Sequence, residues 1–91
     1  MRKSETILTE ICKDYDLRPV EIQGRSGAKK SRSPYVVRAR HHWWFRLKDE
    51  LHLSFPEIAM ETSPTTDHTS VIHGVRKFAR QCGLVNWKSV R

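Results

Sequence analysis

Side chains that can hydrogen-bond to nucleotide bases gather in one short stretch near the C-terminal end of the chain. They comprise one carboxylate, two imidazoles, three hydroxyls and one ammonium group, on Thr66, Asp67, His68, Thr69, Ser70, His73 and Lys77. A carboxylate accepts from cytosine N4, a hydroxyl bonds to base edges, and a threonine methyl contacts thymine. Apolar residues recur among them at helical spacing, at Val71, Ile72, Val75, Phe78 and Ala79. The pattern predicts a helix over 67–81 with one buried face and an outward face suited to reading DNA.

A shorter helix is expected immediately upstream, over 54–62. Ser54 can accept from the backbone of Glu57, whose side chain can reach back, which is the capping box that begins many helices. Pro56 lies in the first turn, where a missing N–H is harmless, and Pro64 restrains the residue before it and ends the helix. Two helices joined in this way form the helix-turn-helix arrangement that places a recognition helix in the DNA major groove.

Positive charge concentrates upstream of these two helices. Between Gly24 and Lys48 the chain has eight basic residues and no acidic one. They are Arg25, Lys29, Lys30, Arg32, Arg38, Arg40, Arg46 and Lys48. A solvated surface loop is the plain interpretation of the Gly- and Ser-rich part, residues 24–33. Because this loop accompanies a helix-turn-helix pattern and lacks balancing carboxylates, we favour contact of Lys29, Lys30 and Arg32 with DNA phosphates or the minor groove.

Length and composition point to one basic domain that spans residues 1–91. Seventeen basic residues against ten acidic ones give a net charge of +7 and an isoelectric point near 9.9, which favours a polyanionic partner. Cys12 and Cys82 form no CxxC pair, and we expect two small buried hydrophobes in a reducing compartment. The sequence has neither a membrane-spanning apolar stretch nor a signal-peptide core, so a cytoplasmic location and no membrane partner are expected.

Two further helices are expected to complete an all-α core. The first covers 3–15, where apolar residues recur every four positions, and the second covers 34–51 after the start signal Ser33-Pro34. A brief helical turn is expected from Pro19 to Gly24. Beyond the glycine stop signal, three residues are expected to pack back on the first helix: Leu84, Val85 and Trp87.

Three side chains make the 34–51 helix unusual. Trp43 and Trp44 are adjacent, about 100° apart on a helix, so one of them is expected to be part-exposed. Core packing is the favoured role for the pair, and a stacking platform for single-stranded bases is the alternative. Arg40 projects onto the centre of the same apolar arc, so either it reaches past the core edge or the helical phase differs slightly.

Catalytic and metal chemistry is not indicated. The five histidines and two cysteines do not follow the spacing of a structural zinc site, and adjacent histidines on a helix point in different directions. No spacing suggests a nucleophile with its base, and no glycine-rich phosphate loop is present. We therefore expect no enzyme activity, no cofactor, no metal and no nucleotide.

The stretch FPEIAMETSPTTDHTSVIHGVRKF resembles the C-terminal DNA-binding domain, domain IV, of the bacterial replication initiator DnaA. That family has a proline-glutamate-isoleucine helix, a turn, and then aspartate-histidine-threonine-threonine-valine at the start of the recognition helix. Here Asp67, His68, Thr69, Ser70 and Val71 stand in those places. The resemblance covers roughly residues 5–82. It implies a compact all-α helix-turn-helix domain similar to that of the Trp repressor, with the helix-turn-helix at about 54–81.

The resemblance also implies roles for particular residues. At the recognition helix it implies major-groove base contacts from Asp67, His68 and Thr69, with Ser70 on bases or phosphate. Elsewhere it implies DNA contacts by Arg40 and Lys48, a thymine methyl contact by Pro56, and a minor-groove contact by Lys30 or Arg32. The chain is too short to include the initiator's ATPase module as well. It therefore points to a stand-alone binder.

The leading hypothesis is a monomeric, sequence-specific binder of double-stranded DNA that regulates replication or transcription, with a partner protein also conceivable. Simpler structural roles remain open for two residues, since Asp67 can merely cap its helix and Thr69 can bond back to it. Two other classes also remain open. One is a nonspecific single-stranded DNA- or RNA-binding protein that uses the basic loop and the tryptophans. The other is a protein-interaction module whose basic face meets an acidic partner.

Overall fold

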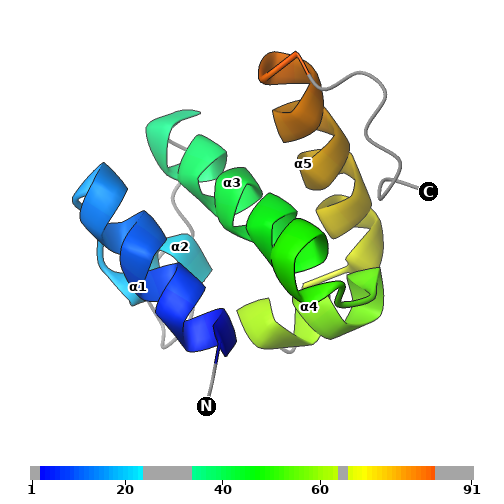
Figure 1. The fold of residues 1–91 in the computed structure, drawn as a ribbon, viewed down its shortest axis with the longest axis horizontal. Coiled ribbons are helices and arrows are strands. Elements are labelled where there is room, and N and C mark those ends of the chain that lie inside the picture. Colours follow the sequence, from blue (N-terminus) through cyan, green and yellow to red (C-terminus); the bar gives the residue numbers. More distant parts are fainter. Residues whose placement is uncertain (1–2, 24–33, 64–65, 84–91) are drawn as a thin grey trace.

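Five helices make up the described part of the chain. The structure, a computed structural model, describes residues 3–23, 34–63 and 66–83 (Figure 1). These ranges contain no strand, and their helices are α1 (Lys3–Tyr15), α2 (Pro19–Gln23), α3 (Pro34–Leu51), α4 (Phe55–Thr62) and α5 (His68–Gln81). The all-α prediction is confirmed, and the four longer helices begin and end within one residue of their predicted bounds. The predictions for the basic loop 24–33 and the tail 84–87 lie outside the described residues.

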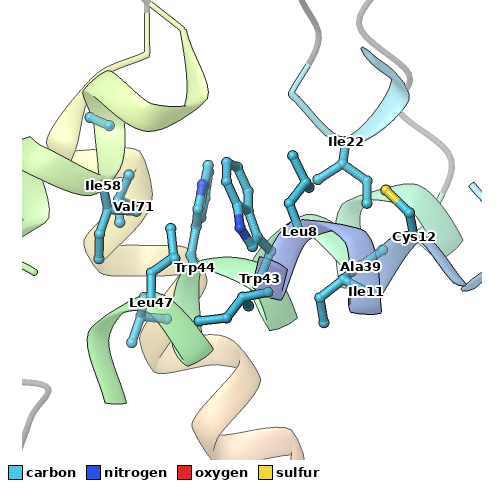
Figure 2. Close-up of a cluster of buried hydrophobic side chains, with 13 residues drawn as sticks. Leu8, Ile11, Cys12, Ile22, Ala39, Trp43, Trp44, Leu47, Ile58 and Val71 are labelled. Atoms are coloured by element: carbon cyan, nitrogen blue, oxygen red, sulfur yellow. The ribbon is translucent and has the colours of Figure 1, made fainter. Parts of the chain in front are cut away.

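Helix α3 lies at the centre of the domain. Helices α1 and α2 pack along one side of it and α5 along the other, while α4 lies across one end (Figure 1). Because two sides of α3 are covered, Trp43 and Trp44 are only 1% and 4% exposed. The expectation that one tryptophan is part-exposed is therefore wrong. Figure 2 shows both indoles inside the apolar cluster, with Leu8 of α1 next to Trp43.

The two cysteines have different environments. Cys12 is buried on the inner stripe of α1 beside Leu8 and Ile11, as expected, and burial raises the pKa of its thiol. Cys82 is exposed, so the expectation that it is buried is wrong. The reason is its position as the C-cap of α5, one residue past the last helical turn. Both thiols are free. In the described ranges, no helix has the length and apolar character needed to cross a membrane.

Candidate nucleic-acid interface

The start of α4 is fixed by a capping box. The Ser54 hydroxyl accepts from the Glu57 backbone N–H at 3.2 Å, and the Glu57 carboxylate accepts from the Ser54 N–H at 2.8 Å. These hydrogen bonds hold the pKa of the Glu57 carboxyl below its usual value. Pro56 is exposed in the first turn, and the Lys48 ammonium lies 4.8 Å from the centroid of the Phe55 ring. Two residues expected on DNA, Pro56 and Lys48, are thus brought to the same end of α4.

The turn between α4 and α5 is closed by local hydrogen bonds. The backbone N–H of Thr66 donates to the carbonyl of Ser63 at 3.1 Å, and the two hydroxyls lie 2.9 Å apart. Asp67 is the N-cap of α5, and its carboxylate accepts from the Thr69 N–H at 3.1 Å. The capping role considered for Asp67 is therefore present. It does not exclude base reading, because a carboxylate has two oxygens that each accept more than one hydrogen bond.

Helix α5 separates a polar outward face from an apolar inward face, as predicted. The residues expected to face DNA are exposed, namely Asp67, His68, Thr69, Ser70, His73 and Lys77, except that Thr66 is half-buried. On the opposite face Val71 and Val75 are fully buried. Ile72, which was expected to face inward, is only half-buried. The buried valines hold α5 against the domain and leave its N-terminal turn open to solvent.

Gly74 lets α5 approach α3 closely, a feature that the sequence reasoning missed. A Cβ atom at this position would lie 2.6 Å from His41 Cδ2 and 2.6 Å from Trp44 Cε3. A glycine inside a helix costs about 1 kcal/mol relative to alanine, so a glycine on the inward face was itself a signal of close packing.

Trp44 also ties α3 to the end of α4. Its indole N–H donates to the Thr62 hydroxyl at 2.8 Å, and that hydroxyl donates to the carbonyl of Ile58 at 3.0 Å. A buried tryptophan with its N–H satisfied inside the protein cannot stack on a nucleotide base. Trp43 is 1% exposed and is also out of reach of a base, so the two adjacent tryptophans do not form the single-strand platform that was considered as an alternative.

Arg40 is buried, whereas the resemblance implies that it contacts DNA. It is 7% exposed, its Nε donates to the Ile22 carbonyl at 2.6 Å, and its Nη2 donates to the Glu21 carbonyl at 3.3 Å. Burial lowers the pKa of the guanidinium. Arg40 lies on the side of α3 that α2 covers, so its donors bond to the end of α2. Its position at the centre of the apolar arc therefore requires neither a side chain that reaches past the core edge nor a shift in the helical phase of α3.

A polar pocket lies against the N-terminus of α5. It has a volume of about 290 Å³ and lies where α2, α3 and the α4–α5 turn meet. Its lining residues are Gln23, Arg40, His41, Trp44, Thr62, Thr66, Asp67 and Ser70. The end of α2 and the predicted base-reading residues therefore share one hollow of the surface.

The excess positive charge lies outside the described residues. Residues 3–23, 34–63 and 66–83 contain ten basic and ten acidic residues, so their formal charges cancel. The net charge of +7 equals the charge of the remaining segments, which contain Arg2, Arg25, Lys29, Lys30, Arg32, Lys88 and Arg91. Within the neutral part the charges are separated, because α5 has three basic residues and no acidic one. Attraction to a polyanion therefore depends on the 24–33 loop, the termini and the surface of α5.

The histidines do not form a metal site in the described residues, where no group of three potential ligands is found. His41 stacks on Trp44, with ring centroids 5.5 Å apart, and His42 stacks on Phe78 at 4.6 Å. Burial, with smaller contributions from Lys77 and Arg40, lowers the pKa of His41 to about 4. Burial also lowers the pKa of His42. Both imidazoles are therefore neutral packing groups at neutral pH.

From the lowered pKa values of these two histidines we predict that the domain loses stability in mild acid. Below the unfolded pKa of 6.5 the unfolded imidazoles take up protons that the folded ones do not. The free energy of unfolding should therefore fall as the pH drops from about 6.5 toward 4, where the His41 contribution levels off. We expect a loss on the order of 1–2 kcal/mol between about pH 7.5 and 5, measured by urea unfolding.

Two variants separate this effect from other titrations. His41→Phe keeps an aromatic ring against Trp44 but has no proton to bind, so it should weaken the pH dependence. His41→Gln, whose side chain also has no proton to bind, should weaken the pH dependence in the same way. An equal pH dependence in the wild type and His41→Phe would show that His41 is not the titrating group.

The capped turn, the buried inward face of α5 and its exposed polar start define a helix-turn-helix DNA-binding domain. The family model for the bacterial DnaA protein helix-turn-helix matches residues 4–78. The chain therefore belongs to this family, and the resemblance seen in the sequence is confirmed. No curated protein and no solved structure matches the chain.

Proposed function

We propose that this protein is a sequence-specific binder of double-stranded DNA that controls replication or transcription by occupying its site. In this proposal the N-terminal turn of α5 reads bases in the major groove. The basic loop 24–33 contacts the minor groove or the phosphates, and Lys48 and Pro56 add contacts near the start of α4. Family membership supports DNA binding in general, and the finer assignments rest on the arrangement of the side chains.

The observation that carries the proposal is the exposed cluster at the start of α5. Asp67, His68, Thr69 and Ser70 are all exposed at the first turn of a helix whose other face is held by fully buried valines. A recognition helix enters the major groove by its N-terminal residues, which need this combination of a fixed helix axis and open hydrogen-bonding groups. Phosphate binding alone would not require a carboxylate there, since a carboxylate near phosphates is costly unless it accepts a base donor.

Selection of bound duplexes from a random pool is the experiment that tests the proposal. A sequence-specific reader should enrich a defined site and bind it about 10³-fold or more tightly than random duplex. Binding to the same sequence as duplex and as single strands should then be compared at several salt concentrations. A pool that yields no enriched site, together with equal binding of single strands, would instead indicate a nonspecific nucleic-acid binder.

Thr69→Ala should cost about 1–3 kcal/mol of binding free energy on the selected site and much less on random duplex. The reason is that a base contact depends on sequence, whereas a phosphate contact does not. His68→Ala should behave in the same way. The measurement is a pair of dissociation constants, on the selected and on the random duplex, at one fixed salt concentration.

Thr9→Ala is the matched control, because Thr9 is an exposed threonine of α1 whose hydroxyl bonds within its own helix, to Glu5 O. It should change neither constant. Asp67→Ala needs a melting curve beside it, since loss of the N-cap should itself cost about 0.5–2 kcal/mol of stability. If the Thr69 and His68 variants fold normally and lose specific and nonspecific binding equally, α5 is not the recognition helix.

A further inference from the structure

Trp44 of α3 contacts both helices of the helix-turn-helix. On the pyrrole edge of its indole, the Nε1–H donates to the hydroxyl of Thr62, at the end of α4, at 2.8 Å. On the benzo edge, Cε3 and Cζ3 would lie 2.6 and 2.7 Å from a Cβ atom on Gly74 of α5. Figure 2 shows Trp44 in the same buried cluster as Ile58 of α4 and Val71 of α5. One rigid side chain therefore meets α4 and α5 at opposite edges of its ring.

The hydrogen bond between Trp44 and Thr62 is buried and directional. The two residues are 4% and 1% exposed, and the Thr62 hydroxyl also donates to the carbonyl of Ile58 at 3.0 Å. This hydroxyl thus accepts one hydrogen bond and donates another, which fixes its orientation. A hydrogen bond weakens steeply when its angle is poor, whereas an apolar contact tolerates sliding. The bond therefore sets where the end of α4 lies along the indole.

The turn that follows Thr62 leads directly to the residues proposed to read bases. The backbone N–H of Thr66 donates to the carbonyl of Ser63 at 3.1 Å, which holds the turn compact. Trp44 and Thr62 also line the polar pocket together with Asp67, the N-cap of α5. A shift of the end of α4 along the indole would therefore change the angle at which α5 begins.

We propose that Trp44 is a positioning residue that fixes the angle between α4 and α5 through its hydrogen bond to Thr62. The first turn of α5 then presents its side chains to base edges in one orientation. The inference rests on the proposed function, and it assigns part of the sequence discrimination to two buried residues that do not touch DNA. Attraction to phosphates depends on charge and not on this angle, so nonspecific affinity is set elsewhere.

The test compares Thr62→Val with Thr62→Ser. Valine has a shape similar to that of threonine but lacks the hydroxyl, whereas serine keeps the hydroxyl and lacks the methyl group. Both changes should lower the melting temperature, because one leaves the buried indole N–H without its acceptor and the other leaves a small cavity. Thr9→Val is the matched control, since it makes the same change at an exposed threonine of α1 that bonds within its own helix.

Each folded variant is measured on the selected duplex, on duplexes with single base changes where Thr69→Ala loses discrimination, and on random duplex across a salt series. Thr62→Val should lose about fivefold or more of the discrimination between the selected and the changed duplexes. Its affinity for random duplex and its salt slope should stay as in the wild type. Thr62→Ser and Thr9→Val should keep the discrimination. A purely structural role would lower the melting temperature of Thr62→Val without changing the discrimination by the folded protein.

Three other results would overturn the inference or the proposal beneath it. Full discrimination by folded Thr62→Val would leave the bond to Trp44 without a positioning role. Equal losses in Thr62→Val and Thr62→Ser would show that packing around the methyl group, and not the hydrogen bond, sets the angle. A wild-type protein that binds the selected and the changed duplexes equally would instead refute the proposed function.

A change on the other side of the bond is the test if Thr62→Val does not fold. In Trp44→3-benzothienylalanine, introduced by chemical synthesis of the chain, a sulfur atom replaces the indole N–H and the ring keeps its shape. No buried donor is left without an acceptor, because the Thr62 hydroxyl still donates to Ile58. The discrimination should fall in the same way. Full discrimination by this protein would contradict the inference.

Discussion

Gly74→Ala should destabilise the domain by about 1–3 kcal/mol, although alanine normally stabilises a helix relative to glycine by about 1 kcal/mol. The added Cβ would lie 2.6 Å from both His41 Cδ2 and Trp44 Cε3, too close for real atoms. Trp44 cannot easily move away, because it is 4% exposed and its indole N–H is bonded to Thr62. Helix α5 must therefore shift away from α3. The melting temperature should fall by about 4–8 °C for each kcal/mol lost.

Whether Gly74→Ala lowers or raises the stability of the domain decides whether α5 packs closely on α3. Arg76→Ala, at an exposed position of the same helix, is the control and should lie within about 0.5 kcal/mol of the wild type. Adding His41→Ala to Gly74→Ala removes one of the two side chains that the added Cβ would meet and should recover part of the loss. Sequence-specific DNA binding should fall in Gly74→Ala because the angle of α5 changes. An increase in stability would mean that α5 and α3 are not packed this closely.

Features set within one helical turn could be predicted from the sequence. The capping box of Ser54 and Glu57 and the N-cap role of Asp67 depend on residues two or three positions apart, so the local sequence contains the whole interaction. The two faces of α5 were also predictable, because this helix buries only one side. The exposed residues of the candidate interface on α5 follow from the same pattern.

Features that depend on two-sided packing could not be predicted in this way. A one-sided apolar arc assigns one tryptophan of the adjacent pair to solvent, but α3 is covered on two sides and buries both Trp43 and Trp44. The partners of Arg40 are the backbone carbonyls of α2, and nothing in the residue types of Glu21 and Ile22 marks their carbonyls as acceptors. Long-range contacts of backbone groups leave no trace in the local pattern.

Replacing Lys29, Lys30 and Arg32 together by alanine should weaken duplex binding roughly a hundredfold at about 0.15 M salt. The described residues contribute no net charge, and these three residues supply three of the seven excess positive charges of the chain. Each phosphate contact releases a counterion, so the slope of log affinity against log salt should fall by up to roughly three units. The measurement is the dissociation constant on selected and random duplex across a salt series.

An equal loss of charge elsewhere is the control for this experiment. Lys3, Lys13 and Arg18, which belong to α1 or to its connection to α2, can be changed to alanine, with the same effect on net charge. Because α1 and α5 lie on opposite sides of α3, this variant should keep most of the salt slope (Figure 1). Equal losses in the two variants would mean that overall charge, and not the 24–33 loop, drives binding. If the loop variant also loses its preference for narrow A·T segments, Arg32 acts in the minor groove as well as on phosphates, since narrow minor grooves attract inserted arginine side chains.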